Sequence, residues 1–154
     1  MKNPVAKVSQ LIRCPAADAF DAFVDPARIT QFWLTATSAP LAEGADVTWQ
    51  FMVPGATERT RVTEWSRPHR IAFDWSDGIR VRLDFEAPRA GETHLAVEVQ
   101  GFTGANAVEQ ALNATEGFAI VLCDLKTLLE GGRSANLVRD KARLIVGSAD
   151  APKA

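Results

Sequence analysis

The sequence predicts an α+β fold in which a curved antiparallel sheet of about six or seven strands packs against one long C-terminal helix, with two short helices near the N-terminus. Residues 79–86 and 94–100 alternate apolar and polar side chains, so one face of their sheet is apolar and the other is in water. Residues 106–130 carry apolar side chains at spacings of three and four. This helix is the only segment long enough to cover the apolar face, and a curved sheet gripping a helix encloses a cavity.

The N-terminal segment is predicted to form one strand and both short helices. A strand over residues 5–12 ends at Cys14-Pro15, and proline is suited to begin a helix because its fixed backbone angle is helical. Asp25 is a favourable N-cap and Pro26 a favourable first helical residue. A second short helix is therefore expected over residues 26–32.

The next strands are predicted between turn-forming dipeptides. Val47, Trp49 and Phe51 alternate with polar residues, which places these three side chains on one face, toward the long helix. The expected strands are residues 47–53, 57–64 and 71–75, and the expected turns are Pro54-Gly55, Arg67-Pro68 and Ser76-Asp77-Gly78.

The long helix has a start signal and a stop signal. Asn106 followed by Glu109 resembles a capping box, and Gly131-Gly132 is suited to end the helix. Its predicted apolar face consists of Val108, Ala111, Leu112, Thr115, Phe118, Val121, Leu122, Leu125, Leu128 and Leu129.

The chain length of 154 residues is that of one domain with its own hydrophobic core. Residues 1–132 are expected to form this domain. Residues 133–154 form a tail that we expect to pack in part, through Leu137-Val138 and residues 144–146, and then to fray.

Charge and composition argue against several classes of protein. The net charge is −2, with 17 basic and 19 acidic residues and no charged block at either end, so binding to nucleic acid or to an anionic membrane is not indicated. No apolar run is long enough to span a bilayer, and residues 1–15 lack the apolar core of a signal peptide. Cys14 and Cys123 lie far apart, as expected for reduced thiols. We therefore predict a cytoplasmic protein.

The sequence offers little for catalysis or metal binding. His69 lies beside a proline turn and His94 on a polar strand face, and neither has a second His or Cys at ligand spacing. No glycine-rich phosphate loop is present, and no Ser, Cys or Thr nucleophile is paired with a histidine in a recognisable motif. We therefore predict no catalytic residue, no metal and no cofactor, and expect a protein that is not an enzyme.

Four tryptophans in a chain without tyrosine provide apolar surface with an indole N–H donor. We expect Trp75 to belong to the core, Trp49 to form the wall of a pocket, and Trp33 to lie at its mouth. Trp65 is the fourth.

Arginines on the water-facing side of the predicted strands have acidic residues nearby. We favour cross-strand ion pairs over a patch that docks an anion or a protein. The basic residues are Arg59, Arg61, Arg67, Arg70, Arg80 and Arg82, and the acidic ones are Asp74, Asp77, Asp84, Glu86 and Glu98.

Several strings in a fixed order resemble one protein family. The entry helices of this family resemble residues 20–26 with Ile29 and Phe32-Trp33, and its strand, proline turn and Trp-ended strand resemble residues 62–68 and 70–75. Its last hairpin resembles residues 91–95 with Gly101-Phe102. Its final helix resembles Gly117-Phe118 with Leu122, Leu125 and Leu129. The family is the START-like (SRPBCC) superfamily, in particular homologues of the activator of heat shock protein 90 ATPase. The resemblance covers about residues 5–132, and residues 136–140 resemble a tail of some small bacterial members.

The resemblance implies a helix-grip (START-like) fold with an internal apolar cavity. Phe118 stands where the family usually has Trp, and Val99 where it often has His, so this interior is expected to be less polar than that of a typical member. The superfamily includes lipid carriers, aromatase and cyclase domains, hormone receptors and chaperone activators. The fold therefore implies no single activity.

We predict a non-enzymatic intracellular protein, monomer or homodimer, that binds a small hydrophobic or aromatic molecule, such as a lipid or polyketide, between sheet and helix. One alternative is a co-chaperone-like interaction module with a filled cavity, whose partner is a chaperone or another protein. A second is a cyclase- or hydrolase-type enzyme using an inward carboxylate such as Glu64 or Asp74. The predicted ligand-binding residues are Phe32, Trp33, Trp49, Phe51, Phe73, Trp75, Val81, Leu83, Phe85, Leu95, Val97, Val99, Phe118, Leu122 and Leu125.

Overall fold

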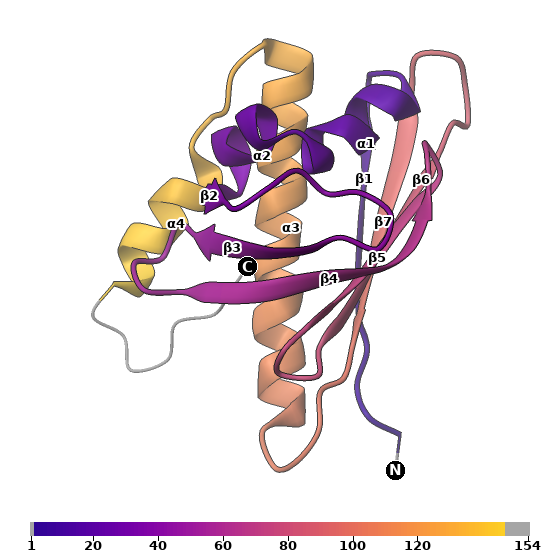
Figure 1. Ribbon diagram of the computed structural model, residues 1–154. Helices are drawn as coiled ribbons and strands as arrows, with labels where there is room; N and C mark the ends of the chain where they lie inside the picture. Colours follow the sequence, from indigo (N-terminus) through magenta and orange to yellow (C-terminus); the bar gives the residue numbers. More distant parts are fainter. Residues whose placement is uncertain (1, 147–154) are drawn as a thin grey trace.

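The computed structural model describes residues 2–146, which form one sheet and four helices (Figure 1). The strands are β1 (Ala6–Ile12), β2 (Leu34–Thr37), β3 (Asp46–Phe51), β4 (Thr57–Ser66), β5 (Arg70–Trp75), β6 (Arg80–Glu86) and β7 (Thr93–Gln100). The helices are α1 (Ala16–Val24), α2 (Pro26–Phe32), α3 (Ala107–Gly131) and α4 (Leu137–Ile145).

The seven strands form a single antiparallel sheet in the order β1-β7-β6-β5-β4-β3-β2. Its register pairs apolar residues across strands: Val81 lies opposite Val99, and Leu83 opposite Val97. All four side chains are buried, whereas the residues between them are more exposed. The predicted alternation and the predicted number of strands are therefore confirmed.

The helix α3 runs along the apolar face of the sheet, and α1 and α2 lie near the C-terminal end of α3 (Figure 1). Asp25 caps α2 as expected, since its Oδ1 accepts a hydrogen bond from the Ala27 N–H at 2.9 Å. Gly132, in the left-handed conformation with φ of 83°, follows the last residue of α3. The α+β fold with a sheet gripping a long helix is confirmed.

The start of α3 differs from the prediction in two ways. Asn106 precedes the helix, but its side chain makes no capping hydrogen bond, so the expected capping box does not form. Val108 and Leu112 are 64% and 65% exposed, although helical periodicity placed them on the apolar face. A helix of 25 residues is about 37 Å long, whereas β7, with 8 residues, is about 27 Å long. The first turns of α3 therefore extend beyond the sheet.

Two elements were not predicted from the sequence. The strand β2 is a four-residue edge strand that pairs with β3 through an irregular register. The helix α4 forms within the predicted tail, and its residues Val138, Ala142 and Ile145 are buried against the rest of the protein. Partial packing of the tail up to residue 146 thus takes the form of an amphipathic helix, and the predicted fraying lies outside the described residues.

Candidate functional site

The fifteen predicted ligand-binding side chains all lie in the interior between the sheet and α3. Each is buried, and all belong to one continuous apolar cluster. The strand parity that was read from the sequence, including the inward orientation of Trp49, therefore holds. Ligand binding by these residues stays a prediction.

Aromatic rings fill the centre of this interior. The Trp33 ring lies 5.0 Å from Trp49 and 5.6 Å from Phe118, measured between centroids, and both contacts are close to edge-to-face. Trp49 in turn lies 5.1 Å from Phe73. Such contacts stabilise a fixed arrangement of rings by about 0.5–1.5 kcal/mol each beyond the burial of their area. Trp33 is thus held in position from several sides.

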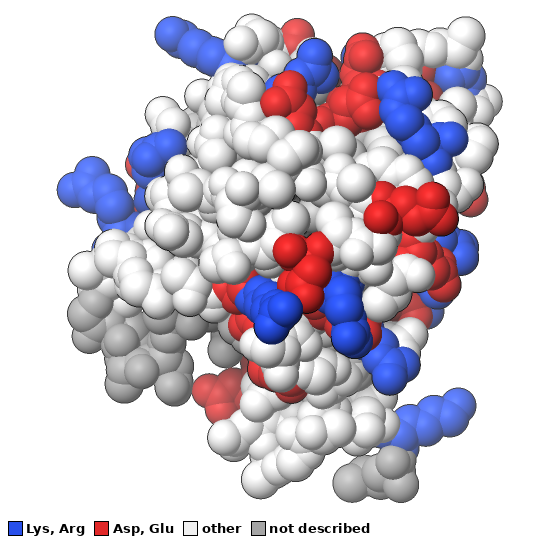
Figure 2. Space-filling model, in the orientation of Figure 1, with Lys and Arg blue, Asp and Glu red and all other residues white. Residues whose placement is uncertain are grey.

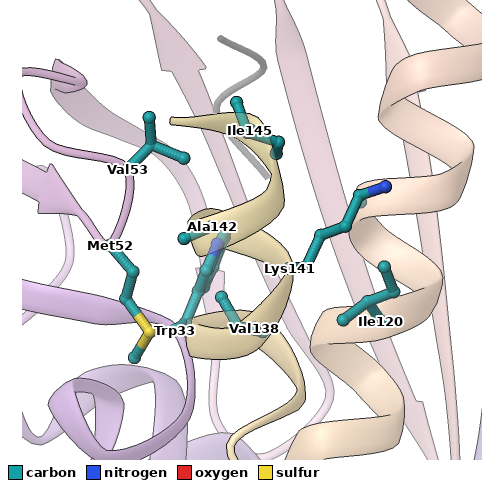
Figure 3. A pocket seen from close by; sticks show the side chains of 9 residues that line it. Trp33, Met52, Val53, Ile120, Val138, Lys141, Ala142 and Ile145 are labelled. Carbon is teal, nitrogen blue, oxygen red and sulfur yellow. The ribbon is translucent and has the colours of Figure 1, made fainter. Parts of the chain in front are cut away.

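A small pocket of about 20 Å³ borders Trp33 beneath α4 (Figure 3). This volume suits one water molecule or one ligand oxygen atom. The pocket is lined by Met52 and Val53 after β3, by Gly117 and Ile120 of α3, and by Val138, Lys141, Ala142 and Ile145 of α4. Trp33, expected at an open mouth, is instead 0% exposed and covered by α4.

The indole nitrogen of Trp33 is buried and has no hydrogen-bond partner within the described part of the chain. In Figure 3 the ring lies behind α4, with its nitrogen at the end of the ring near Ala142. Trp75 differs, since its Nε1 donates to Thr60 Oγ1 at 3.0 Å. Buried N–H groups are nearly always paired in proteins, so the Trp33 N–H is an unsatisfied buried donor on a side chain that lines the small pocket.

Asp124 holds the start of α4 in place. Its side chain is completely buried on α3, and one carboxylate oxygen, Oδ1, accepts a hydrogen bond from Ser134 Oγ at 2.6 Å. The other oxygen, Oδ2, accepts one from the backbone N–H of Val138 at 3.2 Å. Because Val138 lies in the first turn of α4, Asp124 caps that helix from a neighbouring helix. Sequence analysis missed this role.

The carboxylates proposed for a catalytic role lie on the outside of the sheet. Glu64 is exposed and pairs with Arg70 at 3.3 Å, and Asp74 is half-buried and lies 3.7 Å from Arg61. The inward carboxylate of β4 is instead Glu58, whose Oε1 accepts hydrogen bonds from the backbone N–H and the hydroxyl of Ser76. The alternation of Glu58 with outward-facing neighbours in β4 was the signal that could have identified it.

The water-facing side of the sheet carries the cross-strand ion pairs that were predicted. Across strands, Arg70 contacts Asp84 at 2.6 Å and Arg82 contacts Glu98 at 2.7 Å; within β6, Arg82 also contacts Asp84 at 2.9 Å. Arg59 pairs with Asp46 at 2.8 Å. Figure 2 shows basic and acidic side chains interspersed on the visible face, without a large area of one sign.

Two further properties concern the described residues only. No three His, Cys, Asp or Glu side chains in residues 2–146 lie close enough to hold a metal ion. None of the four helices is both long and apolar enough to cross a membrane.

Comparison with known proteins identifies the family. Residues 13–130 match the family model AHSA1, described as activator of Hsp90 ATPase homolog 1-like protein. The chain belongs to the AHSA1 family. The predicted resemblance within the START-like superfamily is thereby confirmed. The AHSA1 match ends before α4, so Ser134 and Val138, the partners of Asp124, lie outside it. No curated protein matches the chain in sequence.

Several solved structures have the same fold. SSP2350 from Staphylococcus saprophyticus is 27% identical, with 85% of this chain and 95% of that chain covered and a TM-score of 0.76. A structure of the Aha1 dimer from Colwellia psychrerythraea is 14% identical, with 84% of this chain and 98% of that chain covered and a TM-score of 0.74. CalU16 from Micromonospora echinospora is 15% identical, with 95% of this chain and 96% of that chain covered and a TM-score of 0.65.

Proposed function

We propose that this AHSA1 protein is a non-enzymatic intracellular binding protein for a small apolar or aromatic molecule, held between the sheet and α3 beneath α4. The observation that carries the proposal is the buried, unpartnered indole N–H of Trp33 at the pocket. Leaving such a donor unpaired costs about 1–3 kcal/mol. A bound molecule that accepts this hydrogen bond recovers that energy while its apolar body joins the aromatic cluster.

Binding requires the interior to open, because small-molecule sites usually have volumes of about 300–1,000 Å³ and the pocket at Trp33 has about 20 Å³. The element best placed to move is α4, since it covers the pocket. The side chains that α4 buries against the interior are those of Val138, Ala142 and Ile145. Met52, with its flexible unbranched side chain, can also adjust to a ligand.

The chemistry of the interior favours binding over catalysis. The side chains around Trp33 are apolar except for Lys141 at the edge of the pocket. Catalysis depends on polar groups that are positioned to stabilise charge in a transition state. Glu64 and Asp74, the carboxylates considered for such a role, face the other side of the sheet, and the inward carboxylate of Glu58 accepts hydrogen bonds from Ser76. The free cysteines support an intracellular location.

The proposal is tested with freshly expressed protein in two ways. Native mass spectrometry should detect a co-purified small molecule, and N-phenyl-1-naphthylamine, an apolar probe, should give a saturable increase in fluorescence at micromolar concentration. Trp49→Ala should weaken probe binding, whereas Trp65→Phe, a change of a half-buried ring in contact with Phe20, should leave it unchanged. An absence of saturable binding across a broad panel of apolar probes would refute the proposal.

A second candidate is a protein-interaction module, and the filled aromatic interior favours it. A core that is already packed needs no ligand, and the outer surface is then the functional part. The AHSA1 description suggests a chaperone of the Hsp90 type as partner. The test is the ATPase rate of such a chaperone with and without this protein. Stimulation together with failure of all probes would favour this second function.

A further inference from the structure

We infer that the ligand is a neutral aromatic ketone or a related aromatic carbonyl compound, whose carbonyl oxygen accepts a hydrogen bond from Trp33 Nε1 beneath α4. This inference rests on the proposed binding function and specifies the chemical class of the ligand. It follows from three properties of the pocket: the fixed donor, the absence of a free charge among the lining side chains described here, and the shape of the surrounding rings.

The donor has a fixed direction. The Trp33 ring is held by Trp49 at 5.0 Å, with an angle of 67° between the ring planes, and by Phe118 at 5.6 Å with the same angle. Phe23 lies 6.0 Å away in a similar arrangement. An indole nitrogen donates and never accepts a hydrogen bond. The ligand atom beside it is therefore an acceptor, and the pocket of about 20 Å³ suits one oxygen atom.

The acceptor is expected to be neutral. Lys141 is the charged residue that lines the pocket, and its Nζ lies 2.9 Å from Glu116 Oε1, so its charge is already compensated. A carboxylate beside Trp33 would lose its hydration without gaining a free cation, which is costly in an apolar interior. A hydroxyl would also be unfavourable, because the lining side chains offer its proton no acceptor except the weak thioether sulfur of Met52.

The body of the ligand is expected to be aromatic. A planar ring can extend the edge-to-face cluster of Trp33, Trp49 and Phe118 with little loss of packing. The ring would take the space now occupied by the side chains of Val138 and Ala142 when α4 moves outward. The carbonyl oxygen would then lie within hydrogen-bonding distance of the indole nitrogen, next to the small pocket that Trp33 lines.

The test compares three probes of nearly equal shape, 2-acetylnaphthalene, 2-isopropenylnaphthalene and 2-naphthoate, by titration calorimetry on the full chain. The ketone should bind about tenfold more tightly than the alkene, since one hydrogen bond to an otherwise unpaired donor has about that effect. Trp33→Phe should remove this difference, and the control Trp65→Phe should keep it. The ketone should also bind more tightly than the carboxylate.

A second measurement does not depend on the stability of the Trp33→Phe variant. In the wild-type protein with ¹⁵N-labelled tryptophan, the ketone should move the Trp33 indole N–H resonance downfield, and the alkene should not. Equal affinity for ketone and alkene without that shift would overturn the inference and leave the binding function intact. Tighter binding of 2-naphthoate would overturn the neutral class. Failure of all three probes together with N-phenyl-1-naphthylamine would overturn the binding function itself.

Discussion

Replacement of Asp124 by asparagine is predicted to release α4 from the body of the protein. Both carboxylate oxygens accept hydrogen bonds: Oδ1 from Ser134 at 2.6 Å and from Thr127 Oγ1 at 3.3 Å, and Oδ2 from the Val138 N–H at 3.2 Å. An amide of the same shape has one acceptor oxygen. If that oxygen faces the Val138 N–H, the NH₂ group faces the Ser134 hydroxyl, which would have to accept a hydrogen bond where it now donates one to a carboxylate.

The expected cost is about 2–4 kcal/mol in the free energy that holds α4 in place. Hydrogen bonds to a charged acceptor contribute about 1.5–3 kcal/mol each, and at least one is lost in Asp124→Asn. The reorientation that the Ser134 hydroxyl needs beside this fully buried side chain adds to the loss. The apolar contacts of α4 contribute a similar free energy, since burial of Val138 and Ile145 stabilises by about 1.5–3 kcal/mol each. The substitution thus removes a large part of the anchoring of α4.

Hydrogen exchange of backbone amides provides the assay. In Asp124→Asn, amides of residues 138–145 should exchange about 30- to 1,000-fold faster, which corresponds to about 2–4 kcal/mol, while amides of the central strands change much less. The matched control is Asp140→Asn, which removes an exposed carboxylate in the first turn of α4. That change should cost at most about 1 kcal/mol, through the helix dipole.

The reasoning fails if α4 amides in Asp124→Asn stay as protected as in the wild type, because α4 would then be held by its apolar contacts alone. The same variant also tests α4 as the cover of the binding site. If opening precedes binding, a weaker attachment of α4 should increase the apparent affinity for N-phenyl-1-naphthylamine. Lower stability of α4 with unchanged affinity would show that ligands enter elsewhere.

Other predictions concern the core, the ion pairs and acid stability. Leu122→Ala should reduce the free energy of unfolding by about 2–5 kcal/mol in a urea titration, because this buried side chain leaves a void; a loss below 1 kcal/mol would contradict its position. Arg82→Ala and Asp84→Ala should each cost within about 1 kcal/mol, and a larger loss would show a strongly coupled network. The hydrogen bonds and charge of Arg67 lower the pKa of Asp21. This pair therefore stabilises the folded protein above about pH 4, and its contribution is lost as the pH falls through the pKa that Asp21 has in the folded state. Asp21→Asn should therefore flatten the dependence of unfolding free energy on pH below about 4, and an unchanged acid dependence would count against this pair.

The parts of the fold that depend on local pattern could be predicted from the sequence. The alternation over residues 94–100 falls within β7 and misses only its first residue, and the periodicity of residues 106–130 locates α3 to within one residue at each end. Both signals repeat many times, so a single atypical residue does not obscure them. Cross-strand ion pairs followed from the same alternation, because the residues between the apolar ones face water on neighbouring strands.

The parts that depend on contacts between distant segments could not be predicted. The strand β2 has four residues, too few to show a period, and it exists because β3 lies beside it. The position of α4 depends on Asp124, which the sequence places on α3 without any sign that Ser134 and Val138 will approach it. Trp33 was expected at an open mouth for the same reason: the helix that covers it was not foreseen.

The closed interior links affinity to the stability of α4. If opening costs about 2.8 kcal/mol, about 1% of the molecules are open, and the apparent dissociation constant is about 100 times the intrinsic one. A site with an intrinsic dissociation constant of about 10 nM would then bind at about 1 μM. The fifteen interior residues set the intrinsic value, whereas Asp124, Ser134 and the apolar face of α4 set the open fraction. Substitutions in the two groups should therefore have opposite effects: interior truncations weaken binding, and loosening of α4 strengthens it.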